Sequence, residues 1–417
     1  MMQMSARDRQ ALRRLAERYS EIAHADIQQQ RLERYDKTNA MEEVRPVVLI
    51  DEVPWGEIKD EALTNVCAPE LGWLETHLRQ TLYQWEHFQV DLVVPPVFRV
   101  VKQIRVRSGI GIEVQDQQIK SDTGTYISAH AYTDQLRTED DLAKLHEPEI
   151  VYDQAASEQS LAVADELFAG LMEVELAACG GLTYSIWDRI TTFRGPDNLL
   201  MDLAARPDFM HRTARRLMEI ARSEFRQLEE QELLDPYQVI LHCTPACTRE
   251  LPADDFDGHV RPKDVWGRCA AQIFDSVSPD MHDEFDLAYN QDLFNDCGLL
   301  YYGCCEPMDR KIDILRKRFN NLRKISITPW ADPQRAAKNI RGDYVMAAKP
   351  NPAFLAMRQF DPEPVKQEIT RYCEACREHG TTVEFVLKDI STIANNPDNL
   401  TQWAATVKAV IDNYYPA

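Results

Sequence analysis

Two neighbouring thiols and a carboxylate stand together in the segment Gly303-Cys-Cys-Glu306. The apolar run Leu299–Tyr302 directly before it has the composition of a buried strand, and a helical pattern follows. Thiolates and carboxylates are zinc ligands, and a catalytic zinc ion takes three protein ligands and keeps a fourth position open. Because adjacent side chains on a strand point in opposite directions, we expect Cys305 to face a site and Cys304 to pack.

Two further segments carry side chains that bind metals. His242 belongs to Leu241-His-Cys-Thr-Pro-Ala-Cys247, just past a strand-like run, and Glu284 belongs to the helix start Ser278-Pro-Asp-Met-His-Asp-Glu-Phe285. A lone histidine at a strand end is more often a hydrogen-bonded structural residue. Capping and the helix dipole alone explain carboxylates in a first helical turn. For both segments, a metal-binding role and a structural role therefore both remain possible interpretations.

An acidic and aromatic cluster follows another apolar run. The run Pro46–Ile50 predicts a buried strand, and Asp51, Glu52 and Trp55 come directly after it. A loop that follows a buried strand is a common position for functional side chains in α/β proteins. We therefore expect this loop to contribute to the same site as Gly303-Cys-Cys-Glu306.

Apolar runs of strand character alternate with helical patterns along the chain, and this alternation predicts a parallel sheet. Nine runs are candidates for what we expect to be eight strands, and eight strand–helix units favour an α/β fold of the (β/α)8 TIM-barrel type. In such a barrel the site lies at the carboxyl ends of the strands. Besides residues 46–50, the candidate strands are 90–95, 179–184, 237–243, 271–277, 299–304, 324–328, 344–348 and 382–388.

Two segments fall outside the regular alternation. Residues 1–44 are charged and helical in period, and we predict an N-terminal helical extension that packs on the main body or on a second copy of the chain, as in a homodimer. Residues 45–417 form the predicted barrel. Within it, residues of about 97–135 alternate in polarity around Gly109, Gly111 and Gly124, which predicts a β-hairpin insertion.

Composition excludes several classes of function. The chain has 417 residues and a net charge of −21, which argues against a nucleic-acid partner. No apolar run approaches the roughly 18 residues that span a bilayer, so we expect no membrane association. The first residues lack the apolar core of a secretory signal, and the 10 cysteines are too few for a disulfide framework at this length. We therefore predict a cytoplasmic protein with reduced thiols.

The order of five segments resembles the uroporphyrinogen decarboxylase superfamily, which includes cobalamin-linked methyltransferases. Members of that family carry a Ser-Pro-Glu helix start, a His-x-Cys-Gly-Asn-like strand end, a Gly-Asn-x-x-Pro segment and a final Pro-x-Asn. The resemblance spans residues 45–415 and implies a (β/α)8 barrel with its site at the carboxyl ends of the strands. The segments are Gly195-Pro-Asp-Asn-Leu-Leu-Met-Asp-Leu203, Ser278–Phe285, Gly303-Cys-Cys-Glu-Pro307, Lys349-Pro-Asn-Pro-Ala-Phe-Leu355 and Asn396-Pro-Asp-Asn-Leu400.

The positions at which this chain departs from the family pattern indicate which branch of the family it resembles more. The decarboxylases open with an arginine-rich loop that grips substrate carboxylates, whereas this chain has the acidic segment Asp51-Glu-Val-Pro-Trp-Gly-Glu57 there, which would repel them. The methyltransferases bind zinc through a His-x-Cys pair and a later cysteine. Cys305 matches the cysteine of that pair, but Gly303 stands at the histidine position, and Lys388-Asp389 stands near the later cysteine.

The resemblance therefore implies a zinc-dependent methyltransferase of the O-demethylase kind. Such an enzyme moves a methyl group from a small methylated compound to the cobalamin of a separate corrinoid protein, and this chain has no recognisable corrinoid-binding module of its own. The implied roles are zinc ligation by Cys305, Glu306, His242 and Glu284, catalysis by Asp51, Glu52 and Tyr302, and substrate binding by Trp55 and Asn351.

Two alternatives stay open. The first is a metal-free decarboxylase or lyase of the same fold, with Asp51 or Glu52 as the acid–base group. The second is a non-catalytic barrel, because the histidine and the late cysteine of the family are missing from their positions. Dependence of activity on a metal ion would separate the first alternative from the methyltransferase.

Overall fold

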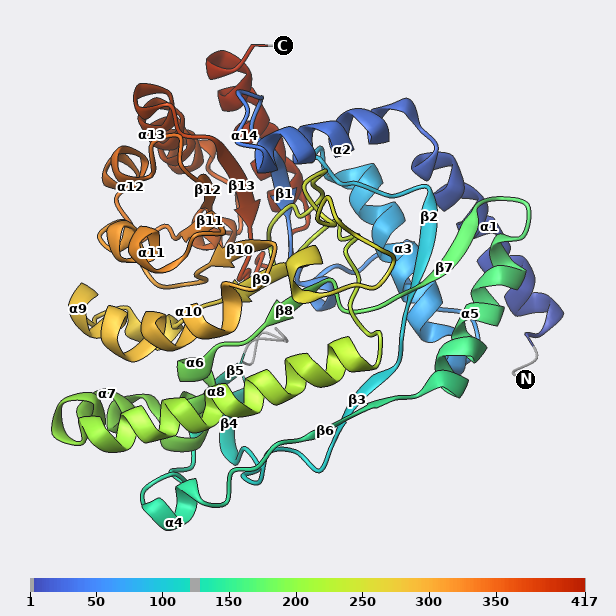
Figure 1. Ribbon diagram of the computed structural model, residues 1–417. Coiled ribbons are helices and arrows are strands. Elements are labelled where there is room, and N and C mark those ends of the chain that lie inside the picture. The colour runs from blue at the N-terminus through green and yellow to red at the C-terminus, as the bar shows by residue number, and fades with distance from the viewer. Residues whose placement is uncertain (1–3, 121–127, 417) are drawn as a thin grey trace.

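A parallel sheet of seven strands forms the centre of the computed structural model, which describes residues 4–120 and 128–416 (Figure 1). The predicted α/β class with a parallel sheet is confirmed. Closure into an eight-stranded barrel is not detected among the described residues. In spatial order the strands are β1 (Val48–Ile50), β13 (Val383–Leu387), β12 (Val345–Ala348), β11 (Leu322–Ile327), β10 (Leu299–Tyr302), β9 (Trp266–Cys269) and β8 (Gly181–Thr183).

Helices separate successive strands of the sheet and cover its outer side (Figure 1). Several begin with a capping side chain followed by proline: Ser278 accepts a hydrogen bond from the Met281 amide before α9, and Asp332 accepts one from the Gln334 amide before α12. The helices of this region are α6 (Ile186–Arg194), α7 (Pro196–Ala205), α8 (Pro207–Glu230), α9 (Pro279–His282), α10 (Ala288–Phe294), α11 (Ile312–Arg318), α12 (Pro333–Ile340), α13 (Pro362–His379) and α14 (Asp398–Tyr414).

Short helical turns occupy several loops around the sheet. A π-helical turn at Asp283–Leu287 joins α9 to α10. The 3₁₀ turns are η1 (Trp55–Glu57), η2 (Glu61–Leu63), η3 (Pro69–Leu71), η4 (Pro262–Asp264), η5 (Gln272–Phe274) and η7 (Pro352–Leu355). Two of them, η1 and η7, lie in loops in which the sequence predicts site residues.

Three of the predicted strands differ from the structure. Residues 237–243 form loops with one isolated bridge between Ile240 and Pro245, and residues 90–95 form no strand, although the Asp91 amide donates to the Val48 carbonyl at 2.8 Å. The strand predicted at 271–277 lies earlier, at Trp266–Cys269. The apolar run that follows that strand packs as buried loop and 3₁₀ turn, which composition alone does not distinguish from a strand.

The N-terminal residues form two helices, α1 (Ala6–Ala23) and α2 (Asp26–Asn39). α1 packs against α3 (Gly72–His87) and α5 (Gln154–Phe168), and together they bury a second apolar core that includes Leu12 and Tyr19. The strand pair β2 (Val97–Val101) and β7 (Glu173–Ala177) belongs to the same layer (Figure 1).

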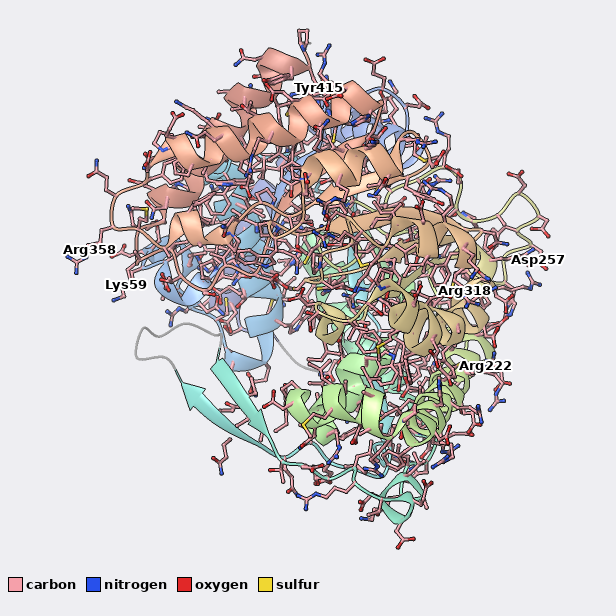
Figure 2. The ribbon with its side chains drawn as sticks, turned by 90° about the vertical axis from the view of Figure 1, so that its left-hand side faces the viewer. Lys59, Arg222, Asp257, Arg318, Arg358 and Tyr415 are labelled. Carbon is pink, nitrogen blue, oxygen red and sulfur yellow. The ribbon has the colours of Figure 1, made fainter. Side chains whose placement is uncertain are left out.

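The segment around residues 97–152 forms two antiparallel pairs. β3 (Ile104–Arg107) pairs with β6 (Glu149–Tyr152), and β4 (Asp116–Lys120) pairs with β5 (Ser128–Tyr132). The connection between β4 and β5 lies outside the described residues, and the short helix α4 (Glu139–Leu142) follows them. The β4–β5 pair projects from the body at the lower left of Figure 2.

The two faces of the sheet bury different residues. Trp266, Leu299, Tyr301 and Ala347 form an apolar cluster on the inner face, whereas alternate residues such as Tyr302 face the helices. The carboxyl ends of the strands therefore meet at one end of the inner face, which is where a parallel sheet places a site. Within the described residues, no helix has the length and apolar character needed to cross a membrane.

Candidate functional site

The two thiols lie where β10 ends. Gly303 has a φ of +101°, a backbone conformation that favours glycine, and this turn takes the chain out of the strand. The Cys304 and Cys305 sulfur atoms lie 3.7 Å apart and face the same space. Cys304 is buried, as expected, but its sulfur also lines the site, because the side-chain alternation of a strand no longer applies after Gly303.

The ammonium group of Lys388 contacts both thiols. It follows β13, is 3 % exposed, and its Nζ lies 3.4 Å from Cys304 Sγ and 3.5 Å from Cys305 Sγ. The same Nζ lies 2.6 Å from Asp389 Oδ2, and the Cys305 thiol donates to that carboxylate at 3.4 Å. The nearby thiols and carboxylate raise the pKa of Lys388 despite its burial, so it carries a positive charge at this position.

An imidazole completes the cluster. His242 Nε2 lies 3.6 Å from Cys304 Sγ. The backbone here is strained, since His242, Cys243, Glu52 and Asp389 all have positive φ values although none is glycine. Strain of this kind persists only where the surrounding structure enforces it, and it concentrates at functional sites.

The electrostatic surroundings separate the two thiols. The pKa of Cys304 is lowered by hydrogen bonding from Cys305, then by His242 and by the charges of Lys388 and Arg268, against the effect of burial. The pKa of Cys305 is raised, because it shares its proton with Cys304 and is also buried. Cys304 is therefore the thiol that ionises first, and thiolates are both nucleophiles and metal ligands.

Glu306, a predicted zinc ligand, is engaged elsewhere. Its fully buried carboxylate accepts hydrogen bonds from the Ala271 amide at 3.0 Å and from the Cys304 amide at 2.9 Å. These bonds tie the turn after β10 to the turn after β9. The structure therefore gives Glu306 the role of holding the thiol-bearing turn in place.

Glu284 is also distant from the thiols. It lies on the outer helical layer with its side chain 57 % exposed, 3.0 Å from His211 Nε2. The four predicted ligands Cys305, Glu306, His242 and Glu284 are thus not brought together. In the part of the chain that the structure describes, no three His, Cys, Asp or Glu side chains form a ready metal site.

Two donor spacings at Cys304 nevertheless match those of zinc ligands. Neighbouring donors of a tetrahedral zinc ion lie about 3.5–3.8 Å apart, since Zn–S bonds are about 2.3 Å and Zn–N bonds about 2.0–2.1 Å. Cys304 Sγ lies at 3.7 Å from Cys305 Sγ and at 3.6 Å from His242 Nε2. The ammonium of Lys388 is the cation that these thiols contact in the structure, so a metal ion there requires that Lys388 turn aside.

The acidic loop after β1 adjoins the cluster. Glu52 Oε2 accepts a hydrogen bond from the Asp389 amide at 2.8 Å, and Asp51 Oδ1 accepts one from the Glu52 amide at 2.9 Å. Burial, then the charge of Asp51, raises the pKa of Cys243, which places Asp51 beside that thiol. Glu52 therefore positions the Lys388-Asp389 loop, and Asp51 lies at the edge of the cluster.

Trp55 and Tyr302 lie apart from the thiols. The Trp55 ring meets the edge of Tyr83 and lines a different cavity, beside Lys59 and Gln80. Tyr302 is fully buried on the helix side of the sheet, where its hydroxyl donates to Asp286 at 2.6 Å and lies 2.6 Å from His282 Nε2. Strand alternation explains the position of Tyr302, because Tyr301 takes the inward place.

A pocket of about 370 Å³ opens beside the thiols. Asn351, which the sequence predicts to bind substrate, lines this pocket, and its Oδ1 also accepts from the Ala353 amide at 3.0 Å. Trp330 lies at the rim and is 72 % exposed. The lining residues are Cys304, Cys305, Thr328, Pro329, Trp330, Lys349, Pro350, Asn351, Pro352, Ala353, Ala356, Lys388, Asp389, Ser391 and Thr392.

Sequence reasoning missed Lys388 and Asp188 as members of the site. Asp188 begins α6, accepts from the Gln272 amide at 2.9 Å, and has its pKa raised to about 7, mainly by burial and also by the charges of Glu306 and Cys304. A carboxyl group that titrates near neutral pH suits acid–base chemistry. The sequence signal that could have identified Lys388 is its position directly after the strand at 383–387. Asp188 likewise lies in the segment that follows the short strand β8.

Comparisons with known proteins give remote likenesses in structure alone. No protein-family model matches the sequence, and no curated protein matches it. A solved methyltransferase from Methanosarcina mazei is similar in structure, with 12% sequence identity, a TM-score of 0.47, and coverage of 92% of this chain and 98% of that chain. A likeness this distant leaves the activity to be argued from the site.

Proposed function

We propose that this chain is a methyltransferase that takes the methyl group of a small methylated compound at the pocket beside Cys304. One observation carries the proposal: two thiols, one of them adjoining an imidazole, meet a buried ammonium at the carboxyl ends of parallel strands, on the wall of a pocket of about 370 Å³. The carboxyl ends of the strands are where such sheets carry their chemistry. Thiols and imidazole are also the donors that catalytic zinc prefers.

In this proposal Cys304, Cys305 and His242 hold zinc, with Lys388 turned away from the thiols. Bound zinc would supply Lewis-acid polarisation of the oxygen, nitrogen or sulfur atom that carries the methyl group. This set replaces the ligands Glu306 and Glu284 of the sequence prediction. The proposed methyl acceptor is cobalamin on a separate corrinoid protein, which is the acceptor that the family resemblance implies.

The remaining side chains of the pocket have physical roles. Lys388 lines the pocket, and once its ammonium has turned aside from the thiols it can donate a proton to the group that leaves the methyl carbon. Pro329, Trp330 and Pro352 line the opposite parts of the pocket with apolar surface, which excludes water from a bound substrate. The hydrogen bond between Glu52 and the Asp389 amide holds the backbone of the loop that carries Lys388 beside the pocket.

Metal analysis of protein prepared without chelators tests the proposal. We expect about one zinc ion per chain, and expect Cys304→Ser and Cys305→Ser each to remove most of it together with methyl transfer to a corrinoid protein. Cys67→Ser is the matched control, because Cys67 lies beside the second core, near α1. Wild-type protein without zinc, together with full activity in Cys304→Ser, would overturn the proposal.

Asp188 favours a second candidate function, a metal-free decarboxylase or lyase. Its pKa of about 7 suits a general acid or base, and Lys388 already supplies a cation at the thiols. In this second candidate function, Asp188 takes the acid–base role that the sequence analysis gave to Asp51 or Glu52. Activity that survives chelators and is lost in Asp188→Asn would support it, whereas activity restored only by added zinc would exclude it.

A further inference from the structure

Two buried cations near the thiols form no salt bridge with a described residue, although the charge of Glu384, which pairs with Lys324, acts on one of them, Lys349. Lys349 is 2 % exposed, donates to the Cys243 carbonyl at 2.6 Å and lies over the Tyr301 ring at 5.6 Å, but forms no salt bridge with any described residue. Arg268 is 6 % exposed, and its Nε and Nη2 have no hydrogen-bond partner among the described residues. Buried charges are normally paired, so this arrangement needs an explanation.

Both cations belong to the wall around Cys304. Lys349 lines the pocket together with Cys304. Arg268 lies two residues after Trp266 on β9 and so shares the inner face of the sheet, where it pairs in register with Tyr301. Its charge contributes to the lowered pKa of the Cys304 thiol, as expected of a guanidinium close behind that residue.

A third group on the same wall also lacks a partner. Thr328 lines the pocket, is 2 % exposed, and its hydroxyl makes no hydrogen bond to a described residue. Lys388 differs from these groups, because Asp389 already compensates its charge at 2.6 Å. Lys349 and Arg268 therefore add positive charge to the wall without a salt bridge to a described residue, and Thr328 adds a hydroxyl without a hydrogen-bond partner among them.

We propose that this pocket receives a carboxylate group, recognised by Lys349 and Thr328 on its wall and by the charge of Arg268 behind Cys304. The lining also contains apolar side chains, Pro329 and Trp330 among them, so the ligand is a small carboxylic acid with an apolar body. A monoanion fits better than a phosphate dianion, because Asp389 and the Cys304 thiol add negative charge nearby. The inference rests on the proposed function, and it makes the methyl donor a methylated carboxylic acid.

Alkylation of the thiols by two matched reagents tests the charge of the pocket. Iodoacetate carries a carboxylate and iodoacetamide does not. With either reagent the thiolate forms a carbon–sulfur bond as the carbon–iodine bond breaks and iodide leaves with the electron pair. The ratio of the two rates, followed by mass spectrometry of the Cys304–Cys305 peptide in chelator-treated protein, cancels differences in thiolate population.

The folded protein should favour iodoacetate about tenfold more than the same peptide does in urea-unfolded protein. Arg268→Gln should reduce this preference about threefold, and Thr328→Val about twofold. The matched control is Arg222→Gln, which removes a surface arginine of α8 that points outward in Figure 2. Equal ratios in folded and unfolded wild type would overturn the proposal, and so would a ratio unchanged by Arg268→Gln. If Arg268→Gln does not fold, the alkylation-rate ratio of Thr328→Val tests the proposal instead, and a ratio unchanged from wild type would overturn it.

Protection experiments identify the kind of anion. Methoxyacetate should slow the alkylation of Cys304 by iodoacetamide, whereas methoxyacetamide and methyl phosphate should protect less. Stronger protection by either of the latter would overturn the carboxylate assignment. None of these measurements needs zinc, cobalamin or turnover. A carboxylate preference in a protein that transfers no methyl group would therefore contradict the proposed function and leave the carboxylate site standing.

Discussion

The ammonium of Lys388 lies 3.4 Å from the thiol of Cys304, so this cluster of sulfur atoms contains its own cation. A buried thiolate needs such a charge, since an unpaired anion in a protein interior is costly. The same position is the one that a metal ion would take between Cys304 and Cys305. Lys388 therefore acts as a competitor of zinc in the proposed enzyme, and its removal gives a direct test.

Lys388→Met should raise the affinity for zinc about tenfold or more, because the substitution removes the positive charge that the thiols contact without adding a donor. Competition with a chromophoric chelator measures this affinity. Lys317→Met serves as the control, since Lys317 is 69% exposed and pairs with Asp283, away from the thiols. An affinity that falls or stays constant in Lys388→Met would show that zinc does not bind at these thiols.

Glu306→Gln should destabilise the fold by about 2 kcal/mol. In the native protein each carboxylate oxygen accepts a hydrogen bond from a backbone N–H, and the amide nitrogen of glutamine would replace one of these acceptors with a donor. The two amides concerned belong to Ala271 and Cys304. Urea denaturation followed by circular dichroism measures the loss. If Glu306 were a zinc ligand, as the sequence suggested, the zinc content would fall instead while the stability of metal-free protein stayed close to wild type.

Asp188 should make stability fall as the pH rises from about 4 to about 7. Its pKa in the folded state is about 7, raised mainly by burial from the ordinary value of 3.8, so the folded state binds more protons than the unfolded state in this range. The slope is at most about 1.4 kcal/mol per pH unit, and it vanishes above pH 7, where both states are ionised. Denaturation at pH 5 and pH 8 should show a smaller difference for Asp188→Asn than for wild type.

Tyr302→Phe should lower stability by about 1–3 kcal/mol and change kcat/KM by less than about twofold, because the lost hydroxyl leaves buried polar groups unpaired without touching the pocket. The groups concerned are Asp286 and His282, both fully buried. Thermal unfolding and steady-state kinetics of the same preparation separate the two effects. A large loss of activity at unchanged stability would restore the catalytic role that the sequence suggested.

The sequence predicted the strands with the strongest apolar runs and failed where the runs were ambiguous. Leu299–Tyr302 and Val383–Leu387 are strands as expected, because both segments are apolar apart from Glu384 and suit a strand buried on both faces. Residues 237–243 carry a similar composition and form loops instead. Apolar composition indicates that a segment is buried, but it does not show whether the buried segment forms a strand or a loop.

Cys305, His242, the acidic loop and Asn351 were all identified from the sequence as candidates, yet the contacts that their side chains make were not. Glu306 stands next to Cys305 in the chain, but its carboxylate turns toward the Ala271 amide, 35 residues away. Lys388 and His242 contact Cys304 across 84 and 62 residues respectively. No local pattern encodes such contacts, because the order and register of the parallel strands determine which loops meet.

By itself the sequence determined that a parallel α/β sheet forms and that reactive side chains follow its strands, because buried strands and turn-forming glycine leave local signatures. The tertiary structure decided what those side chains do. The turn at Gly303 places Cys304 beside Cys305, and the end of β13 brings the Lys388 ammonium against both. Charge compensation in a buried site depends on distances between distant segments, and only the folded chain sets those distances.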